Sequence, residues 1–173
     1  MRLVQYFDGH IVISIFGLII RIKHNRAYRC PDVKELGITA IKRELPVIVS
    51  LTSFPQRINI VVKTIKTLLT QTVKPDMVIL WLAPEQFPNG ENDLPKELLD
   101  LKKFGLSIDW YRDIRSYKKI IPTLKKYPDA IIITTDDDIY YAPDTVESLY
   151  KSYLEHPDEI QAHRCDWLSL LPL

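Results

Sequence analysis

The chain has 173 residues, of which 46% are hydrophobic and 26% are charged, and its formal net charge at neutral pH is +1. This length and hydrophobic content suffice for one domain with a packed core, and they argue against an intrinsically disordered protein. Because no block of consecutive basic residues stands out, the composition also argues against a general nucleic-acid-binding protein.

Residues 1–45 are expected to form an N-terminal arm and a connector. Residues 11–20 are uncharged and mostly apolar, but this run is well short of the about 20 residues that span a bilayer. It lacks a basic leading region and a small-residue cleavage site, so a signal peptide is not expected. Its β-branched residues favour two short strands or a hairpin. A contact with an anionic membrane surface stays open because of the basic residues that follow, Arg21, Lys23, Arg26 and Arg29.

From residue 46 onward, short apolar runs alternate with segments of helical periodicity. The apolar runs predict buried strands, and the periodic segments predict amphipathic helices. The predicted strands are residues 46–53, 76–83, 106–113 and 129–135, and the predicted helices are residues 57–72, 95–105, 116–128 and 143–157. The second helix has Pro95 at its start and Gly105 at its end, which is the expected asymmetry of helix termini.

Strands that are apolar throughout and alternate with helices predict an α/β fold with an open, mostly parallel sheet and helices on both faces. In such sheets, ligands bind outside the carboxyl ends of the strands. Two of the most polar strand exits are "SLTSFPQR" after the first strand and "TTDDDIYY" after the fourth. We therefore expect a ligand site that includes both segments.

Three consecutive carboxylates, Asp136, Asp137 and Asp138, follow the last predicted strand. Alternate side chains share a face in an extended backbone, so Asp136 and Asp138 are expected to point together and Asp137 away. Two converging carboxylates suit Mg²⁺ or Mn²⁺, which prefers oxygen ligands and can bridge a diphosphate. The alternative is a solvated acidic turn that caps the next helix. The position directly after a buried strand favours the metal site.

The apolar strand followed by three aspartates, "IIITTDDDIYY", resembles the DxD motif of nucleotide-sugar-dependent glycosyltransferases of the GT-A fold. Four segments in order resemble a bacterial group of family-2-like transferases of surface-polysaccharide synthesis: "VSLTSFPQRI", "LLTQTVKPDMVILWLAPEQFP", "SYKKIIPTLKKYPDAIIITTDDDIYY" and "HPDEIQAHR". The resemblance runs from about Pro46 to Arg164 and implies that residues 46–173 form a Rossmann-like, GT-A nucleotide-sugar-binding domain. It implies a UDP- or GDP-sugar donor, a glycan or lipid-linked acceptor, and Mn²⁺ or Mg²⁺ as cofactor.

The same resemblance implies roles for individual residues. The metal is expected on Asp136 and Asp138, with Asp138 as the more direct ligand. One of the two adjacent lysines is expected to reach the diphosphate, and two acidic residues near the third strand's exit are expected to contact the base or ribose. The full set of implied donor-binding residues is Ser50, Leu51, Thr52, Arg57, Asp109, Asp113, Lys118, Lys119, Asp136 and Asp137.

After Arg164 the resemblance ends, whereas GT-A transferases continue into an acceptor-binding half. We therefore expect an incomplete domain without an identifiable catalytic base, with an exposed sheet edge that favours association between copies. Two other functions stay open: a donor-binding protein without turnover, and a phosphohydrolase with an aspartyl nucleophile. Cys30 and Cys165 are far apart and are expected to be reduced thiols of a cytoplasmic protein, which can also be peripheral at the inner membrane.

Overall fold

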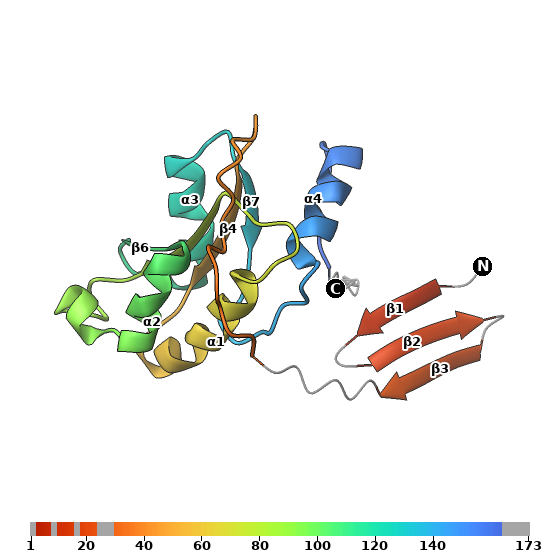
Figure 1. Cartoon of the computed structure of the whole chain (residues 1–173), viewed down its shortest axis with the longest axis horizontal. Helices are drawn as coiled ribbons and strands as arrows, with labels where there is room; N and C mark the ends of the chain where they lie inside the picture. The colour runs from red at the N-terminus through yellow and green to blue at the C-terminus, as the bar shows by residue number, and fades with distance from the viewer. Residues whose placement is uncertain (1–2, 8–9, 16–17, 24–29, 164–173) are drawn as a thin grey trace, which may run out of the picture.

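The computed structural model describes residues 3–7, 10–15, 18–23 and 30–163 (Figure 1). The N-terminal part is a three-stranded antiparallel sheet in the order β1-β2-β3. Its strands are β1 (Leu3–Phe7), β2 (His10–Ile15) and β3 (Leu18–Lys23). The two strands expected from residues 11–20 correspond to β2 and β3, and β1 precedes them as a third strand that was not expected. The predictions for Arg26, Arg29 and Cys165 lie outside the described residues.

The main domain is built on a four-stranded parallel sheet, which confirms the predicted open α/β fold. The strands are β4 (Val47–Thr52), β5 (Met77–Leu82), β6 (Leu106–Trp110) and β7 (Ile131–Thr134), in the spatial order β6-β5-β4-β7. The chain therefore moves outward from β4 to β6 and then returns to the other side of β4. This reversal makes the carboxyl ends of β4 and β7 the topological switch point of the sheet.

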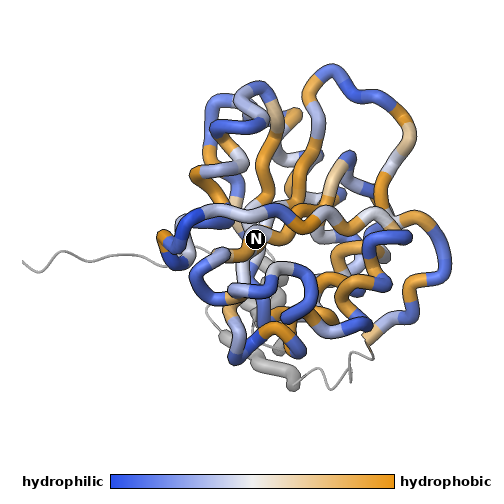
Figure 2. The backbone as a smooth tube through the Cα atoms, turned by 90° about the vertical axis from the view of Figure 1, so that its left-hand side faces the viewer, coloured by the Kyte–Doolittle hydropathy of each residue, from blue (hydrophilic) through white to orange (hydrophobic). Residues whose placement is uncertain are grey.

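Helices cover both faces of this sheet, as predicted. They are α1 (Ile58–Leu68), α2 (Lys96–Asp100), α3 (Ile121–Lys126) and α4 (Thr145–Glu155). Helices α1, α2 and α4 contribute Val61, Leu98 and Val146 to the larger hydrophobic core. On the opposite face, Thr123 of α3 bonds to Ser50 and Trp81 of the sheet. Figure 2 shows hydrophobic and hydrophilic residues alternating along the segments of the main domain.

Several predicted helices are shorter than expected because parts of them are 3₁₀ turns. Turns η3 (Leu101–Phe104) and η4 (Arg115–Lys119) take up parts of the second and third predicted helices, whereas η1 (Pro55–Arg57) directly precedes α1 and η2 (Gly90–Asp93) lies between β5 and α2. Pro122 lies in the first turn of α3, where its missing N–H costs no helix bond. Gly105 ends η3 with a φ of 105°, a left-handed conformation that strongly favours glycine. None of the helices in the described ranges is both long and apolar enough to cross a lipid bilayer.

Strand β7 has an open edge, because β4 is its only partner among the described strands. A groove of about 1050 Å³ lies beside it and is lined by β7, by Leu149 and Tyr153 of α4, and by the segment that follows α4. The N–H groups of Ile131 and Thr135 donate to the carbonyls of Pro46 and Ser50. By the alternation of a strand, the N–H of Thr134 points to the open edge.

We expect copies of the chain to associate through this edge, since unpaired strand edges beside apolar surface pair readily. Thr134→Pro should reduce the association, because proline removes the outward N–H without breaking a bond to β4. Light scattering over a concentration series measures the effect. The control is Ile60→Ser, which changes an exposed apolar side chain of α1. A wild-type chain that stays monomeric at high concentration would contradict the expectation.

Candidate functional site

A cavity of about 530 Å³ lies at the carboxyl ends of the parallel strands. Segments that follow all four strands contribute to its wall, which is the arrangement expected at the switch point of an open α/β sheet. The lining residues are Thr52, Ser53, Phe54 and Arg57 after β4, Gln86 after β5, Asp113, Arg115, Ser116, Lys118 and Lys119 after β6, and Thr135, Asp136, Asp137 and Asp138 after β7.

Asp137 is the most buried of the three consecutive aspartates, with 7% of its surface exposed. Its carboxylate accepts hydrogen bonds from Ser53 Oγ at 2.7 Å and from Arg57 Nη1 at 2.9 Å. Its main-chain carbonyl accepts a third from Thr64 Oγ1 at 2.9 Å. The expectation that Asp137 points away from the site was therefore wrong. Strand β7 ends at Thr134, so the alternation of an extended backbone does not continue through the aspartates.

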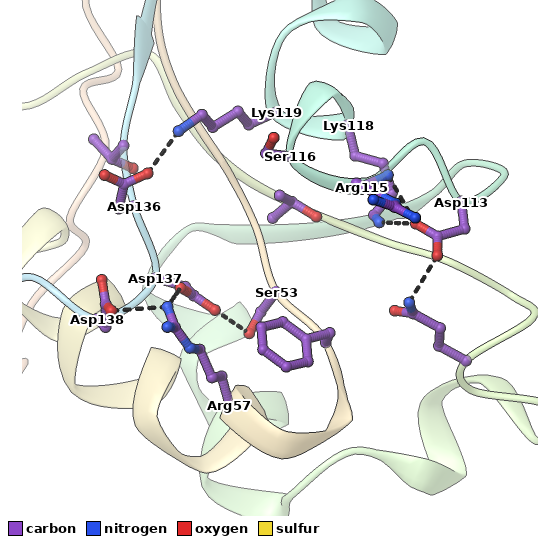
Figure 3. Close-up of a pocket in the computed structure, with 14 residues that line it drawn as sticks. Ser53, Arg57, Asp113, Arg115, Ser116, Lys118, Lys119, Asp136, Asp137 and Asp138 are labelled. Carbon is purple, nitrogen blue, oxygen red and sulfur yellow. Dashed lines mark hydrogen bonds and ion pairs between the residues drawn. The ribbon is translucent and has the colours of Figure 1, made fainter.

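The same guanidinium nitrogen also bonds to Asp138. Arg57 Nη1 lies 2.7 Å from Asp138 Oδ2, so two carboxylates share one cationic nitrogen (Figure 3). The pKa of Arg57 is raised further above its ordinary value, first by the hydrogen bond to Asp137 and then by the charges of Asp137 and Asp138. The guanidinium also lies over the ring of Phe54, with 5.5 Å between its carbon and the ring centroid.

Asp136 has a different cationic partner. Its Oδ1 accepts a hydrogen bond from Lys119 Nζ at 2.6 Å, and its main-chain N–H donates to Tyr141 Oη at 2.8 Å. Figure 3 shows Lys119 approaching Asp136 from the side of η4, whereas Arg57 approaches from the start of α1. The structure therefore groups Asp138 with Asp137 about one cation, and not with Asp136 as the sequence predicted.

A second charged group at the far side of the cavity is centred on Asp113. Its Oδ1 accepts from Lys118 Nζ at 2.6 Å and from the main-chain N–H of Arg115 at 2.9 Å, and its Oδ2 accepts from Gln86 Nε2 at 2.9 Å. The bonds from Lys118 and from the Arg115 N–H lower the pKa of the Asp113 carboxyl, with Lys118 the largest cause. Only 3% of the Lys118 side chain is exposed, and the ion pair with Asp113 offsets the cost of burying the two groups. Arg115 has a φ of 55°, a strained conformation of the kind found at functional sites.

Three of the predicted donor-binding residues lie outside the cavity lining. Ser50 and Leu51 are buried within β4, and Ser50 Oγ bonds to Thr123 Oγ1 at 2.8 Å. Asp109 pairs with Lys126 at 2.6 Å. The other predicted residues all line the cavity, including Thr52 at the end of β4.

Sequence reasoning missed several lining residues: Ser53, Phe54, Gln86, Arg115, Ser116 and Thr135. Ser53 and Phe54 directly follow a predicted residue, so the polar strand exit was a signal for both. Gln86 Oε1 and Thr135 Oγ1 are buried and have no hydrogen-bond partner among the described residues. Buried polar atoms are rarely left unpaired, so these two atoms are available to a water or ligand in the wall of the cavity.

The predicted metal site can be tested against these contacts. Across residues 30–163, no three His, Cys, Asp or Glu side chains cluster closely enough to form a metal site of their own. Asp137 and Asp138 do supply oxygen atoms around one position, which is taken by the Arg57 guanidinium. That donor set fits Mg²⁺ or Mn²⁺ if the guanidinium withdraws and waters or ligand oxygens complete the coordination.

No family model matches the chain, and no curated protein matches it either. The chemistry of the cavity therefore rests on its own residues, which are four acidic and four basic side chains. These side chains can replace the ion pairs among themselves with bonds to a ligand. Such a ligand needs anionic groups for the basic side chains and hydrogen-bond donors for the carboxylates. Residues 46–163 thus form an α/β domain with a charged cavity at the switch point of its sheet.

The alkaline stability of the protein should depend on Tyr141. Burial raises its pKa to about 12, so the folded state favours the neutral phenol. The resulting stability is fully present below about pH 10, the pKa of an unperturbed tyrosine, and is lost as the pH rises toward 12. We expect Tyr141→Phe to cost about 1 kcal/mol at pH 8, because the Asp136 N–H loses its acceptor, and to flatten the alkaline decline.

Urea unfolding at pH 8 and at pH 11 measures both effects. The matched control is Tyr117→Phe, because 64% of Tyr117 is exposed. The account requires the wild-type free energy of unfolding to fall more steeply with pH than that of Tyr141→Phe. Parallel declines in the two proteins would show that the phenol of Tyr141 does not titrate as described.

Proposed function

We propose that the cavity binds a nucleoside-diphosphate sugar, and that the domain supplies the donor site for transfer of that sugar to a glycan or lipid-linked acceptor in bacterial polysaccharide or lipopolysaccharide synthesis. One observation carries the proposal. The residues Arg57, Lys119 and Asp136 to Asp138, from three different strand exits, meet in one cavity at the switch point of a parallel sheet. Nucleotides bind at this position in open α/β sheets.

The basic side chains suit the diphosphate. Arg57 and Lys119 enter the cavity from opposite walls, and Lys118 and Arg115 lie farther along it (Figure 3). A guanidinium group forms paired hydrogen bonds to phosphate oxygens, and an ammonium group adds a compact positive charge. Because Arg57 and Lys119 are held by aspartates in the cavity wall, both cations are oriented toward the cavity.

Other lining residues suit the rest of the donor. Phe54 lines the cavity with 37% of its surface exposed, and an exposed aromatic ring is a stacking surface for a nucleobase. The carboxylates can accept hydrogen bonds from ribose or sugar hydroxyl groups. Gln86 Oε1 is an unpaired acceptor in the same wall. The cavity therefore has groups for the base, the diphosphate and the hydroxyls.

We include Mn²⁺ or Mg²⁺ as the cofactor, held by the carboxylates of Asp137 and Asp138. When bound, such an ion neutralises charge on the departing diphosphate. The residues of the chain orient the donor: Arg57 and Lys119 bind phosphate oxygens, Ser53 and Thr64 hold Asp137 in place, and Tyr141 fixes the main chain at Asp136.

A second candidate is donor binding without turnover, and one observation favours it. An inverting transfer needs a carboxylate base for the acceptor hydroxyl. Among the residues that the structure describes, each carboxylate in the cavity lining is already paired with a basic side chain. Activity tests therefore need to separate binding of the donor from transfer of its sugar.

We also propose that the protein acts in the cytoplasm, peripheral at the inner membrane. Nucleotide sugars are cytoplasmic compounds, and a lipid-linked acceptor is presented at the membrane surface. Arg21 and Lys23 in the sequence of β3 supply positive charge for contact with anionic lipid. This placement needs no helix that spans the bilayer.

Calorimetric titration of UDP- and GDP-sugars in the presence of Mn²⁺ tests the donor site. We expect one class of donor to bind, and Lys119→Gln to weaken its binding about tenfold, since one charge-assisted hydrogen bond to phosphate is lost. The matched control is Lys126→Gln. Both lysines form an ion pair with an aspartate at 2.6 Å, but Lys126 lies outside the cavity lining.

The outcomes separate the candidates. Failure of every nucleotide sugar to bind, or equal loss with both lysine variants, would contradict the proposed site. Donor binding without hydrolysis or transfer would support the second candidate. Hydrolysis of a generic aryl phosphate by the purified chain would instead favour an aspartyl phosphohydrolase.

A further inference from the structure

The position between Asp137 and Asp138 is filled by a cation that belongs to the chain itself. Arg57 Nη1 contacts Asp137 Oδ1 at 2.9 Å and Asp138 Oδ2 at 2.7 Å. A divalent ion that used the same two oxygen atoms would have to occupy the position of this nitrogen. Binding of the ion and binding of the guanidinium to this pair of carboxylates are therefore mutually exclusive.

We propose that Arg57 blocks the metal position by holding both carboxylates, and that the diphosphate of the donor opens it by drawing the guanidinium away. The inference rests on the proposed function for the identity of the anion. It assigns the metal position to Asp137 and Asp138, and it makes Arg57 the residue that couples metal binding to nucleotide binding.

Unpaired atoms in the same wall are a second reason to expect a ligand here. Thr135 is only 3% exposed, lines the cavity directly before the three aspartates, and has an Oγ1 atom without a partner among the described residues. The Gln86 Oε1 atom is also buried and has no hydrogen-bond partner among the described residues. Neither atom belongs to the ion pairs of Arg57, so they are independent of the carboxylate contacts.

The burial of the groups shows which partner can move. Only 9% of the Asp137 side chain is exposed, and Ser53 and Thr64 hold the residue by its carboxylate and its carbonyl. In contrast, 41% of the Arg57 side chain is exposed, and all its hydrogen bonds to described residues use the single nitrogen Nη1. The guanidinium can therefore turn toward an anion while the carboxylate stays in place.

The proposal predicts positive coupling between two ligands. An anion that attracts Arg57 exposes the carboxylates to the metal, and a bound metal leaves Arg57 available for the anion. By thermodynamic linkage, nucleotide must increase metal affinity by the same factor by which metal increases nucleotide affinity. A guanidinium that stayed on the aspartates would produce no such coupling through this contact.

Mn²⁺ binding without nucleotide tests the blocking role. Electron paramagnetic resonance of free Mn²⁺ gives the affinity of the full chain. We expect weak binding by the wild type, at least tenfold tighter binding by Arg57→Gln, and weak binding by Arg57→Lys, which keeps a cation at the position. The control is Arg112→Gln, since Arg112 is exposed, lies outside the cavity lining and forms no ion pair with a described residue.

A second measurement uses unfolding temperature. In EDTA, Arg57→Gln should unfold at a lower temperature than the wild type, because buried Asp137 loses its cationic partner. Mn²⁺ should restore much of that loss in Arg57→Gln but not in Arg57→Gln combined with Asp138→Asn. Equal Mn²⁺ affinity in wild type and Arg57→Gln, or no recovery by Mn²⁺, would overturn the proposal.

The wild-type chain alone gives a third readout that does not depend on how the variants fold. UDP or GDP should tighten Mn²⁺ binding at least tenfold. If neither nucleotide binds at any Mn²⁺ concentration, the proposed function fails, while tighter Mn²⁺ binding by Arg57→Gln would still establish the blocking contact. If a nucleotide binds and Mn²⁺ affinity stays unchanged, the coupling role of Arg57 is wrong and the donor site stands.

Discussion

The site depends on one electrostatic constraint, which is that three adjacent carboxylates at the end of a strand repel each other unless cations lie among them. The chain supplies those cations from two distant segments. Arg57 ends η1 after β4, and Lys119 ends η4 after β6. Each forms contacts under 3 Å with the aspartates that follow β7. The positive charges of Arg57 and Lys119, which can attract an anion into the cavity, thus also hold its wall segments together through ion pairs.

The strand order explains why these segments meet. Because β7 returns to the free side of β4, the loops after both strands face one crevice instead of being covered by a crossover. Buried hydroxyl groups then fix the local geometry: Ser53 and Thr64 hold Asp137, and Thr123 links α3 to Ser50 of β4. Asp137 is therefore the buried and held member of the site, while the exposed Arg57 is the part that can exchange partners.

Much of the fold follows from the sequence because each strand is an apolar run and each helix has a regular apolar spacing. The position of the aspartates at a strand exit followed from the same pattern. Their orientation did not, because it depends on the end of β7 at Thr134, and the pairing of Arg57 with Asp137 joins residues 80 positions apart. The family resemblance implied a place in the site for Asp109, but its side chain pairs with Lys126 and lies outside the cavity lining. No sequence signal indicates the positive φ of Arg115.

The most direct test of the central claim is a crystal structure of the chain with UDP or GDP and Mn²⁺. The account predicts the diphosphate in the cavity between the ends of β4 and β7, in contact with Arg57 and Lys119, and Mn²⁺ between Asp137 and Asp138. A nucleotide bound elsewhere, with Arg57 still held by both aspartates, would contradict it.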